Sequence, residues 1–93
     1  MKKTFKLTHP KIKYARLVDT VRRDVKKYIK RERRRELPEG ADFWDFDCKF
    51  GPTAEKAEVI QLSEIGKQIS EAEAGQLTSC YIEILVKPGR RIE

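Results

Sequence analysis

Hydrophobic residues recur along this chain with two different spacings, one typical of strands and the other typical of helices. From Trp44 to Phe50 every second residue is aromatic or cysteine, and the residues between them are Asp45, Asp47 and Lys49. This two-residue repeat predicts a strand with one buried face. Further toward the N-terminus the spacing lengthens to three and four residues and predicts an amphipathic helix. Its apolar side consists of Tyr14, Leu17, Val18, Val21, Val25, Tyr28 and Ile29.

Both spacings together predict elements in the order β-α-β-β-α-β. The predicted strands cover residues 3–8, 43–50, 57–62 and 79–87, and the predicted helices cover 14–36 and part of 63–77. Ser63 and a Ser70–Glu73 capping box are alternative starts for the second helix. This order is typical of the α+β, ferredoxin-like two-layer sandwich, in which both helices cover a four-stranded antiparallel sheet of order 4-1-3-2. With 93 residues, the chain is predicted to form a single domain, residues 1–93.

The charge is divided unevenly along the chain. Residues 1–36 contain 15 basic and 4 acidic residues, and residues 37–93 contain 6 basic and 11 acidic residues. The two parts therefore carry formal charges of +11 and −5, which account for the +6 of the whole chain. This distribution predicts an electrostatically polarised molecule with a long basic first helix.

The first predicted helix is longer than the sheet that it is expected to cover. A helix over residues 14–36 would span ~35 Å, whereas a strand of six to eight residues spans ~20–26 Å. The C-terminal turns are therefore expected to project beyond the sheet as a cationic extension. The predicted topology would also gather one group of cations at this pole: Lys2, Lys3, Lys30, Arg31, Arg33, Arg34, Arg35, Lys87, Arg90 and Arg91.

Clustered lysine and arginine are typical of proteins that bind nucleic acid, although a solvated helix face has the same composition. The outward positions of the sheet include Asp45, Asp47 and Glu83, which would repel phosphate. We therefore expect a non-catalytic protein that binds a polyanion, RNA or a ribonucleoprotein surface, through phosphate contacts of the basic helix. The predicted contact residues are Arg23, Lys27, Lys30, Arg31, Arg33, Arg34 and Arg35.

Two other functions remain open. The chain could serve as a protein-interaction or homodimerisation module that uses an edge strand or the open sheet face with Tyr81 and Leu85. An acidic protein surface is the alternative to RNA as a partner. A small enzyme or ligand-binding protein using His9 and a carboxylate, with His9 as a general base, is the remaining alternative. No nucleophile or orienting carboxylate is suggested near His9, and a role in a polar turn is the simpler interpretation. We predict no catalytic residue and no cofactor.

The carboxylates of Asp45 and Asp47 face the same way on a strand and suit a hard cation such as Mg²⁺. The simpler interpretation is a solvated charge pair, or an ion pair with Lys49 or Lys6, so no metal site is predicted. Cys48 and Cys80 are expected on the two outer strands, buried and too far apart for a disulfide. Sparse cysteine and the lack of an apolar leader or membrane span predict a cytoplasmic protein without membrane partners.

Four segments carry specific motifs. They are TFxLTHPKIK at residues 4–13, VKKYxKRERR at 25–34, LPEGxDFWDFDCKFG at 37–51 and YxEILxKPG at 81–89. Over nearly its whole length, the chain resembles a family of small uncharacterised bacterial proteins, a domain of unknown function. The resemblance implies a bacterial, cytoplasmic setting, and it implies no activity, cofactor or catalytic residue.

Overall fold

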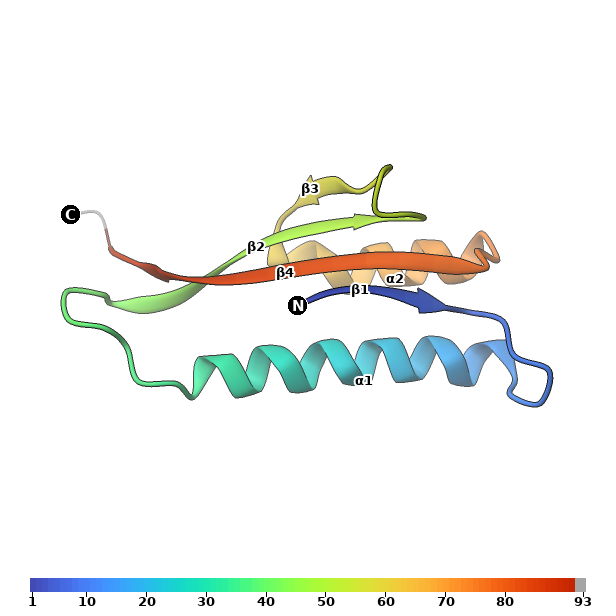
Figure 1. Ribbon diagram of the computed structural model, residues 1–93, viewed down its shortest axis with the longest axis horizontal. Coiled ribbons are helices and arrows are strands. Elements are labelled where there is room, and N and C mark those ends of the chain that lie inside the picture. Colours follow the sequence, from blue (N-terminus) through green and yellow to red (C-terminus); the bar gives the residue numbers. More distant parts are fainter. Residues whose placement is uncertain (92–93) are drawn as a thin grey trace.

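The computed structural model describes residues 1–91 and confirms an α+β fold with the predicted element order. These residues form four strands and two α-helices, and their arrangement is shown in Figure 1. The strands are β1 (Lys2–Lys6), β2 (Phe43–Gly51), β3 (Glu58–Ile60) and β4 (Ser79–Gly89). The helices are α1 (Tyr14–Arg33) and α2 (Ile65–Ala74), and a short 3-10 helix, η1 (Leu62–Glu64), precedes α2.

The four strands form an antiparallel sheet in the order β1-β4-β2-β3. The predicted order 4-1-3-2 is wrong, and the ferredoxin-like topology is not confirmed. β4 is central because it is the longest strand and because Ile82 and Ile84 on it are completely buried. β1 has five residues, of which Lys2, Lys3 and Lys6 are lysines, and this composition suits an edge strand that must not pair further.

Both helices pack on the same face of the sheet. The buried side chains of α1 are Val18, Val21 and Val25, and they join one hydrophobic cluster with Ile65 and Ile69 of α2. The strands contribute the inward residues that the two-residue repeat predicts: Phe5, Phe46, Cys48, Phe50, Cys80, Ile82 and Ile84. The binary pattern of the sequence therefore assigned the buried face of each long element correctly.

β2 and β4 extend beyond the other two strands. They pair along the whole of β2, from Phe43 opposite Gly89 to Gly51 opposite Tyr81. β1 reaches β4 only as far as Glu83, and β3 covers only the last part of β2. The remainder is a two-stranded extension, residues 43–47 with 85–89, which we call the β2–β4 ribbon. It contributes to an elongated molecule of 49 × 23 × 19 Å (Figure 1).

The C-terminal end of α1 lies on the ribbon. The helix ends at Arg33, and its 20 residues span ~30 Å, whereas the 11 residues of β4 span ~36 Å. The Trp44 indole N–H donates to the carbonyl oxygen of Arg35 over 2.9 Å. The expected free extension of the helix is therefore wrong, because the strands beneath it are longer than predicted.

The second helix begins without either predicted cap. α2 starts at Ile65 directly after η1, and no side chain caps it. Ser70 and Glu73 instead accept hydrogen bonds from the guanidinium of Arg22 on α1, over 3.0 and 3.3 Å. The two residues that resemble a capping box therefore connect the helices to each other.

Candidate polyanion-binding surface

Four cations line the side of α1 that faces away from the sheet. Arg23, Lys27, Lys30 and the C-cap residue Arg34 follow one another at intervals of four, three and four residues, which places them on one side of a helix. We call these four residues the outer stripe. All four are exposed, and none of them forms an ion pair with another residue in the described part of the chain. Arg34 lies eleven positions after Arg23, so the stripe is ~16 Å long.

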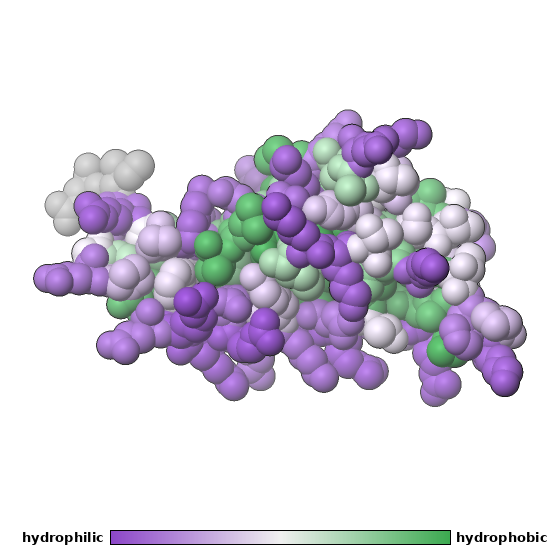
Figure 2. All heavy atoms as spheres, viewed as in Figure 1, coloured by the Kyte–Doolittle hydropathy of each residue, from purple (hydrophilic) through white to green (hydrophobic). Residues whose placement is uncertain are grey.

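The space-filling view shows the same distribution. Hydrophilic side chains crowd the edge of the molecule that α1 occupies, and hydrophobic atoms are visible near the middle, over the β2–β4 region (Figure 2). The cations of the outer stripe therefore belong to a surface that solvent and a partner can reach.

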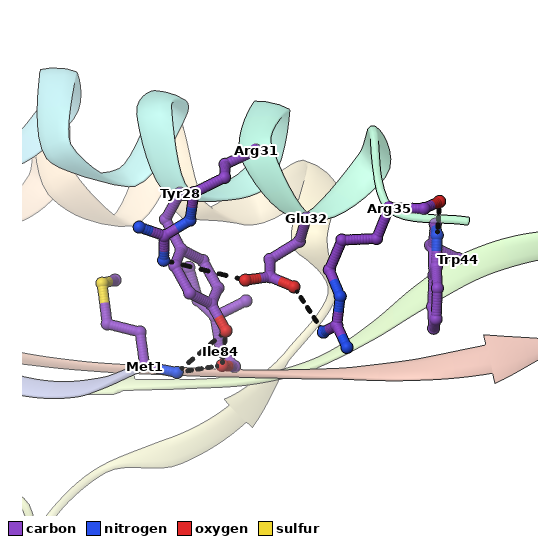
Figure 3. A network of polar contacts seen from close by, with 7 residues as sticks. All are labelled: Met1, Tyr28, Arg31, Glu32, Arg35, Trp44 and Ile84. Atoms are coloured by element: carbon purple, nitrogen blue, oxygen red, sulfur yellow. Dashed lines mark hydrogen bonds and ion pairs between the residues drawn. The ribbon is translucent and has the colours of Figure 1, made fainter. Parts of the chain in front are cut away.

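Three other arginines, on α1 or directly after it, are engaged within the protein. Arg22 contacts Asp19 and Glu73 over 3.5 and 3.3 Å. Arg31 and Arg35 approach the two carboxylate oxygens of Glu32 over 3.7 and 2.8 Å (Figure 3). Two of the seven predicted contact residues are thus partly neutralised.

Glu32 lies on the side of α1 that faces the sheet. Its exposed fraction is 8%, which makes it the one buried charged residue among residues 1–91. Nearby, the Met1 nitrogen donates to the carbonyl of Ile84 over 2.6 Å and to the Tyr28 hydroxyl over 3.1 Å (Figure 3). Desolvation lowers the pKa of the Met1 amino group and raises the pKa of Tyr28. These contacts hold α1 against β1 and β4, so the outer stripe is presented by a fixed helix.

Aromatic rings lie beneath two arginines at the C-terminal end of α1. The Arg33 guanidinium lies over the Phe46 ring at 5.6 Å, and the Arg35 guanidinium lies over the Trp44 ring at 5.5 Å. Both distances are typical of cation–π contacts, which restrict the position of the guanidinium group without neutralising its charge. Arg33 and Arg35 are therefore ordered cations at the end of the helix.

The predicted basic pole is only partly correct. Arg35 contacts Trp44, which pairs with Pro88, and so the end of α1 lies beside the end of β4, which Arg90 and Arg91 follow in the chain. The Lys87 side chain lies on the open face of the sheet, with Asp45 and Asp47. Lys2 and Lys3 do not reach the end of β4, because β1 begins opposite Glu83, in the middle of that strand; they line a hollow beside Lys27 and Arg31 instead. The sheet order is the reason: an edge strand that pairs with only half of β4 cannot reach its end.

A groove lies between the C-terminal half of α1 and η1, and its volume is about 430 Å³. Half-buried Ile29 and Leu62 contribute its apolar residues, and four cations complete its lining. We call it the α1–η1 groove; its cations are Lys26, Lys30, Arg33 and Arg34. Sequence reasoning missed Leu62, because this residue ends a predicted strand and reaches α1 only through the tertiary fold.

The open face of the sheet is unsuitable for phosphate. Asp45 and Asp47 lie 4.0 and 2.8 Å from the Lys87 ammonium group, so their partner is neither Lys49 nor Lys6. The hydrogen bond from Lys87 to Asp47 raises the pKa of the lysine. Tyr81 is buried and donates to Glu83 over 2.8 Å, a bond that raises the tyrosine pKa. Asp45, Asp47 and Lys87 on this face are thus paired with one another, whereas Lys6 and Lys49 have no ion-pair partner among residues 1–91.

The candidates for metal binding and catalysis have structural partners. Among residues 1–91 no group of three histidine, cysteine or acidic side chains is arranged to hold a metal ion. His9 Nδ1 accepts hydrogen bonds from the backbone N–H groups of Lys11 and Ile12 over 3.0 and 3.1 Å. His9 therefore orders the loop before α1, the role in a polar turn considered for it from the sequence.

Both cysteines lie in the two central strands, so their predicted placement on the outer strands is wrong. Cys48 pairs with Ile84, which is four residues from Cys80 along β4, and this separation of ~13 Å prevents a disulfide. Burial raises the pKa of each thiol from 9.0 to about 11, and Asp47 and Asp45 add to the effect at Cys48. Both thiols are therefore protonated and inert at neutral pH.

We expect the buried thiols to weaken the fold at alkaline pH. Below pH 9 the thiols are protonated in both the folded and the unfolded chain, so their raised pKa in the folded chain does not change the free energy of unfolding. Between pH 9 and about 11 only the unfolded chain ionises, so the free energy of unfolding falls by about 1.4 kcal/mol per pH unit for each thiol. Urea unfolding across this range measures the slope. A Cys48→Ala, Cys80→Ala double variant should show a shallower slope, and equal slopes would contradict the assignment.

Comparison with known proteins adds a family. Among residues 1–91, neither helix combines the length and the apolar character that crossing a membrane requires. No curated protein and no solved structure matches the chain. The model of a family of unknown function, DUF6172, matches residues 1–93, and the chain therefore belongs to this family.

Proposed function

We propose that this protein is a non-catalytic binder of polyanions, with RNA or a ribonucleoprotein surface as its target and the outer stripe of α1 as its contact. Neighbouring cations of the stripe are ~4.5–6 Å apart along the helix axis. This spacing is comparable with the distance between neighbouring phosphates of an extended nucleic-acid strand. Two buried free thiols suit a reducing compartment, and we place the function in the bacterial cytoplasm.

The observation that supports this proposal is that the outer stripe lacks, within residues 1–91, the carboxylate partners that other arginines on α1 and directly after it have. Arg22, Arg31 and Arg35 have carboxylate partners within 4 Å, whereas the outer stripe has none among the described residues. Phosphate can therefore approach the stripe without displacing an internal ion pair. Within the predicted set, Arg23, Lys27, Lys30 and Arg34 are the direct contacts, and Arg33 flanks them.

The distribution of acidic residues restricts how a polyanion can bind. α2 and η1 carry Glu64, Glu71 and Glu73, and the open sheet face carries Asp45 and Asp47. A strand of phosphates would be repelled on both surfaces. It is therefore expected to follow α1, because this direction maximises contact with cations and avoids the carboxylates.

The proposal is tested by measuring the affinity of the protein for labelled RNA at increasing salt. Four phosphate contacts predict that log K falls with log salt with a slope of about −3 for a single strand. Fluorescence anisotropy at a series of salt concentrations measures the slope. Failure to bind RNA or DNA at roughly 50 mM salt, or binding that is insensitive to salt, would overturn the proposal.

A second candidate is homodimerisation or protein binding through the open sheet face. Three hydrophobic residues are exposed there: Phe43, Val59 and Leu85, with exposed fractions of 39%, 78% and 41%. Association through this face would bury apolar surface and would depend little on salt. Sedimentation at several protein concentrations separates it from the first proposal, since only dimerisation makes the mass depend on protein concentration.

A further inference from the structure

The α1–η1 groove opens beside the outer stripe and shares Lys30 and Arg34 with it. Its volume of about 430 Å³ lies within the range of ~300–1,000 Å³ that is typical of small-molecule sites. A phosphate that contacts Lys30 would therefore lie at the rim of a concave surface with room for one attached group.

The lining of the groove combines two chemistries. Ile29 and Leu62 present aliphatic surface, while Lys26, Arg33 and Arg34 add positive charge around it. A partner that offers only charge would leave the aliphatic surface unused. A nucleotide suits both parts, because a flat, largely apolar base is attached to each phosphate.

Arg33 supplies a planar group at the groove. Its guanidinium lies over the Phe46 ring at 5.6 Å, and this contact restricts its orientation before any partner binds. Bases of single-stranded RNA stack on arginine planes as well as on aromatic rings. An ordered guanidinium therefore offers a stacking surface at a small cost in conformational entropy.

We propose that the α1–η1 groove receives one unstacked base, so that the protein selects single-stranded nucleic acid over a duplex. This inference rests on the proposed polyanion function and names the substrate class of the same surface. In a duplex the bases are stacked and paired, and only the phosphates could reach the stripe. A single strand could contact the stripe with its phosphates and turn one base toward Ile29, Leu62 and Arg33.

Two labelled single strands of equal phosphate number test this proposal: an oligouridylate of about ten nucleotides and an abasic strand of the same length. A duplex is the third probe. Stacking of one base is worth a factor of about 10 in affinity. The oligouridylate is therefore expected to bind about 10-fold more tightly than the abasic strand, and the groove should add nothing to the affinity of the duplex.

Two substitutions test whether residues of the groove cause the preference for the oligouridylate over the abasic strand. Leu62→Ala should remove most of the difference between the oligouridylate and the abasic strand, because the base loses its aliphatic contact. Arg33→Lys keeps the charge but removes the plane, so it should reduce the same difference while the salt slope stays unchanged. Val59→Ala, a change at an exposed aliphatic residue away from the groove, is the matched control and should change neither quantity. Far-UV circular dichroism confirms that each variant is folded.

The outcomes separate this inference from the function on which it rests. Equal affinity for the oligouridylate and the abasic strand would contradict the proposal that the groove receives a base, and it would leave the proposed polyanion binding intact. Failure of all three probes to bind would overturn both. Equally tight binding of polyglutamate would indicate an acidic protein surface as the partner and would contradict selection of a base.

Discussion

Replacing the four cations of the outer stripe with glutamine is expected to weaken RNA binding by about three orders of magnitude at roughly 50 mM salt. The expected loss follows from the counterions that four phosphate contacts would release on binding. The variant carries Arg23→Gln, Lys27→Gln, Lys30→Gln and Arg34→Gln. Because these side chains are exposed, its free energy of unfolding should change little. Fluorescence anisotropy with labelled RNA measures the affinity.

The matched control removes the same charge elsewhere. Substituting glutamine for Lys6, Lys49, Lys56 and Lys67 lowers the formal net charge from +6 to +2, as the stripe variant does. These four lysines are also exposed and lack an ion-pair partner within residues 1–91. The control should retain most of the affinity. Equal losses in both variants would show that net charge, and not the stripe, attracts RNA.

Truncating the centre of β4 is expected to have the largest effect on stability. The Ile82 side chain is completely buried between the sheet and the helices, and Ile82→Ala leaves a cavity there. Such a change costs about 3–4 kcal/mol, a large share of the ~5–15 kcal/mol that stabilises a small domain. Urea unfolding monitored by the fluorescence of Trp44, the one tryptophan in the chain, measures the loss.

Leu85→Ala is the control on the same strand. Leu85 lies on the open face with an exposed fraction of 41%, so its truncation creates no enclosed cavity. We expect a loss below about 1 kcal/mol. A comparable loss in both variants would contradict the assignment of the two faces of β4.

The hydrophobic spacing predicted the elements and their buried faces. The alternation from Trp44 to Phe50 and the helical repeat from Tyr14 to Ile29 depend on neighbours in the chain, and local geometry decides which side chains share a face. Boundaries were less accurate: β3 has three residues instead of six, because only 58–60 find a partner on β2. A strand ends where its partner ends, and the partner is not visible in local sequence.

The candidate surface was only partly predictable for the same reason. The cations of α1 are evident in the sequence, but their ion pairs are not, since the hydrogen bond from Arg22 to Glu73 joins residues 51 positions apart. The α1–η1 groove depends on Leu62, which is 33 positions from Ile29 in the chain and lies beside it only through the tertiary packing of α2 against α1.

The amino-acid sequence alone determined the fold class, the order of the elements and the outward basic face of α1, because these follow from spacing within single elements. Only the tertiary structure decided the strand order, the contact of the helix end with the β2–β4 ribbon, and which cations remain unpaired. These features arise from long-range packing. β4 lies in the interior of the sheet, where Ile82 and Ile84 are buried, and its partner β2 lies beneath the end of α1.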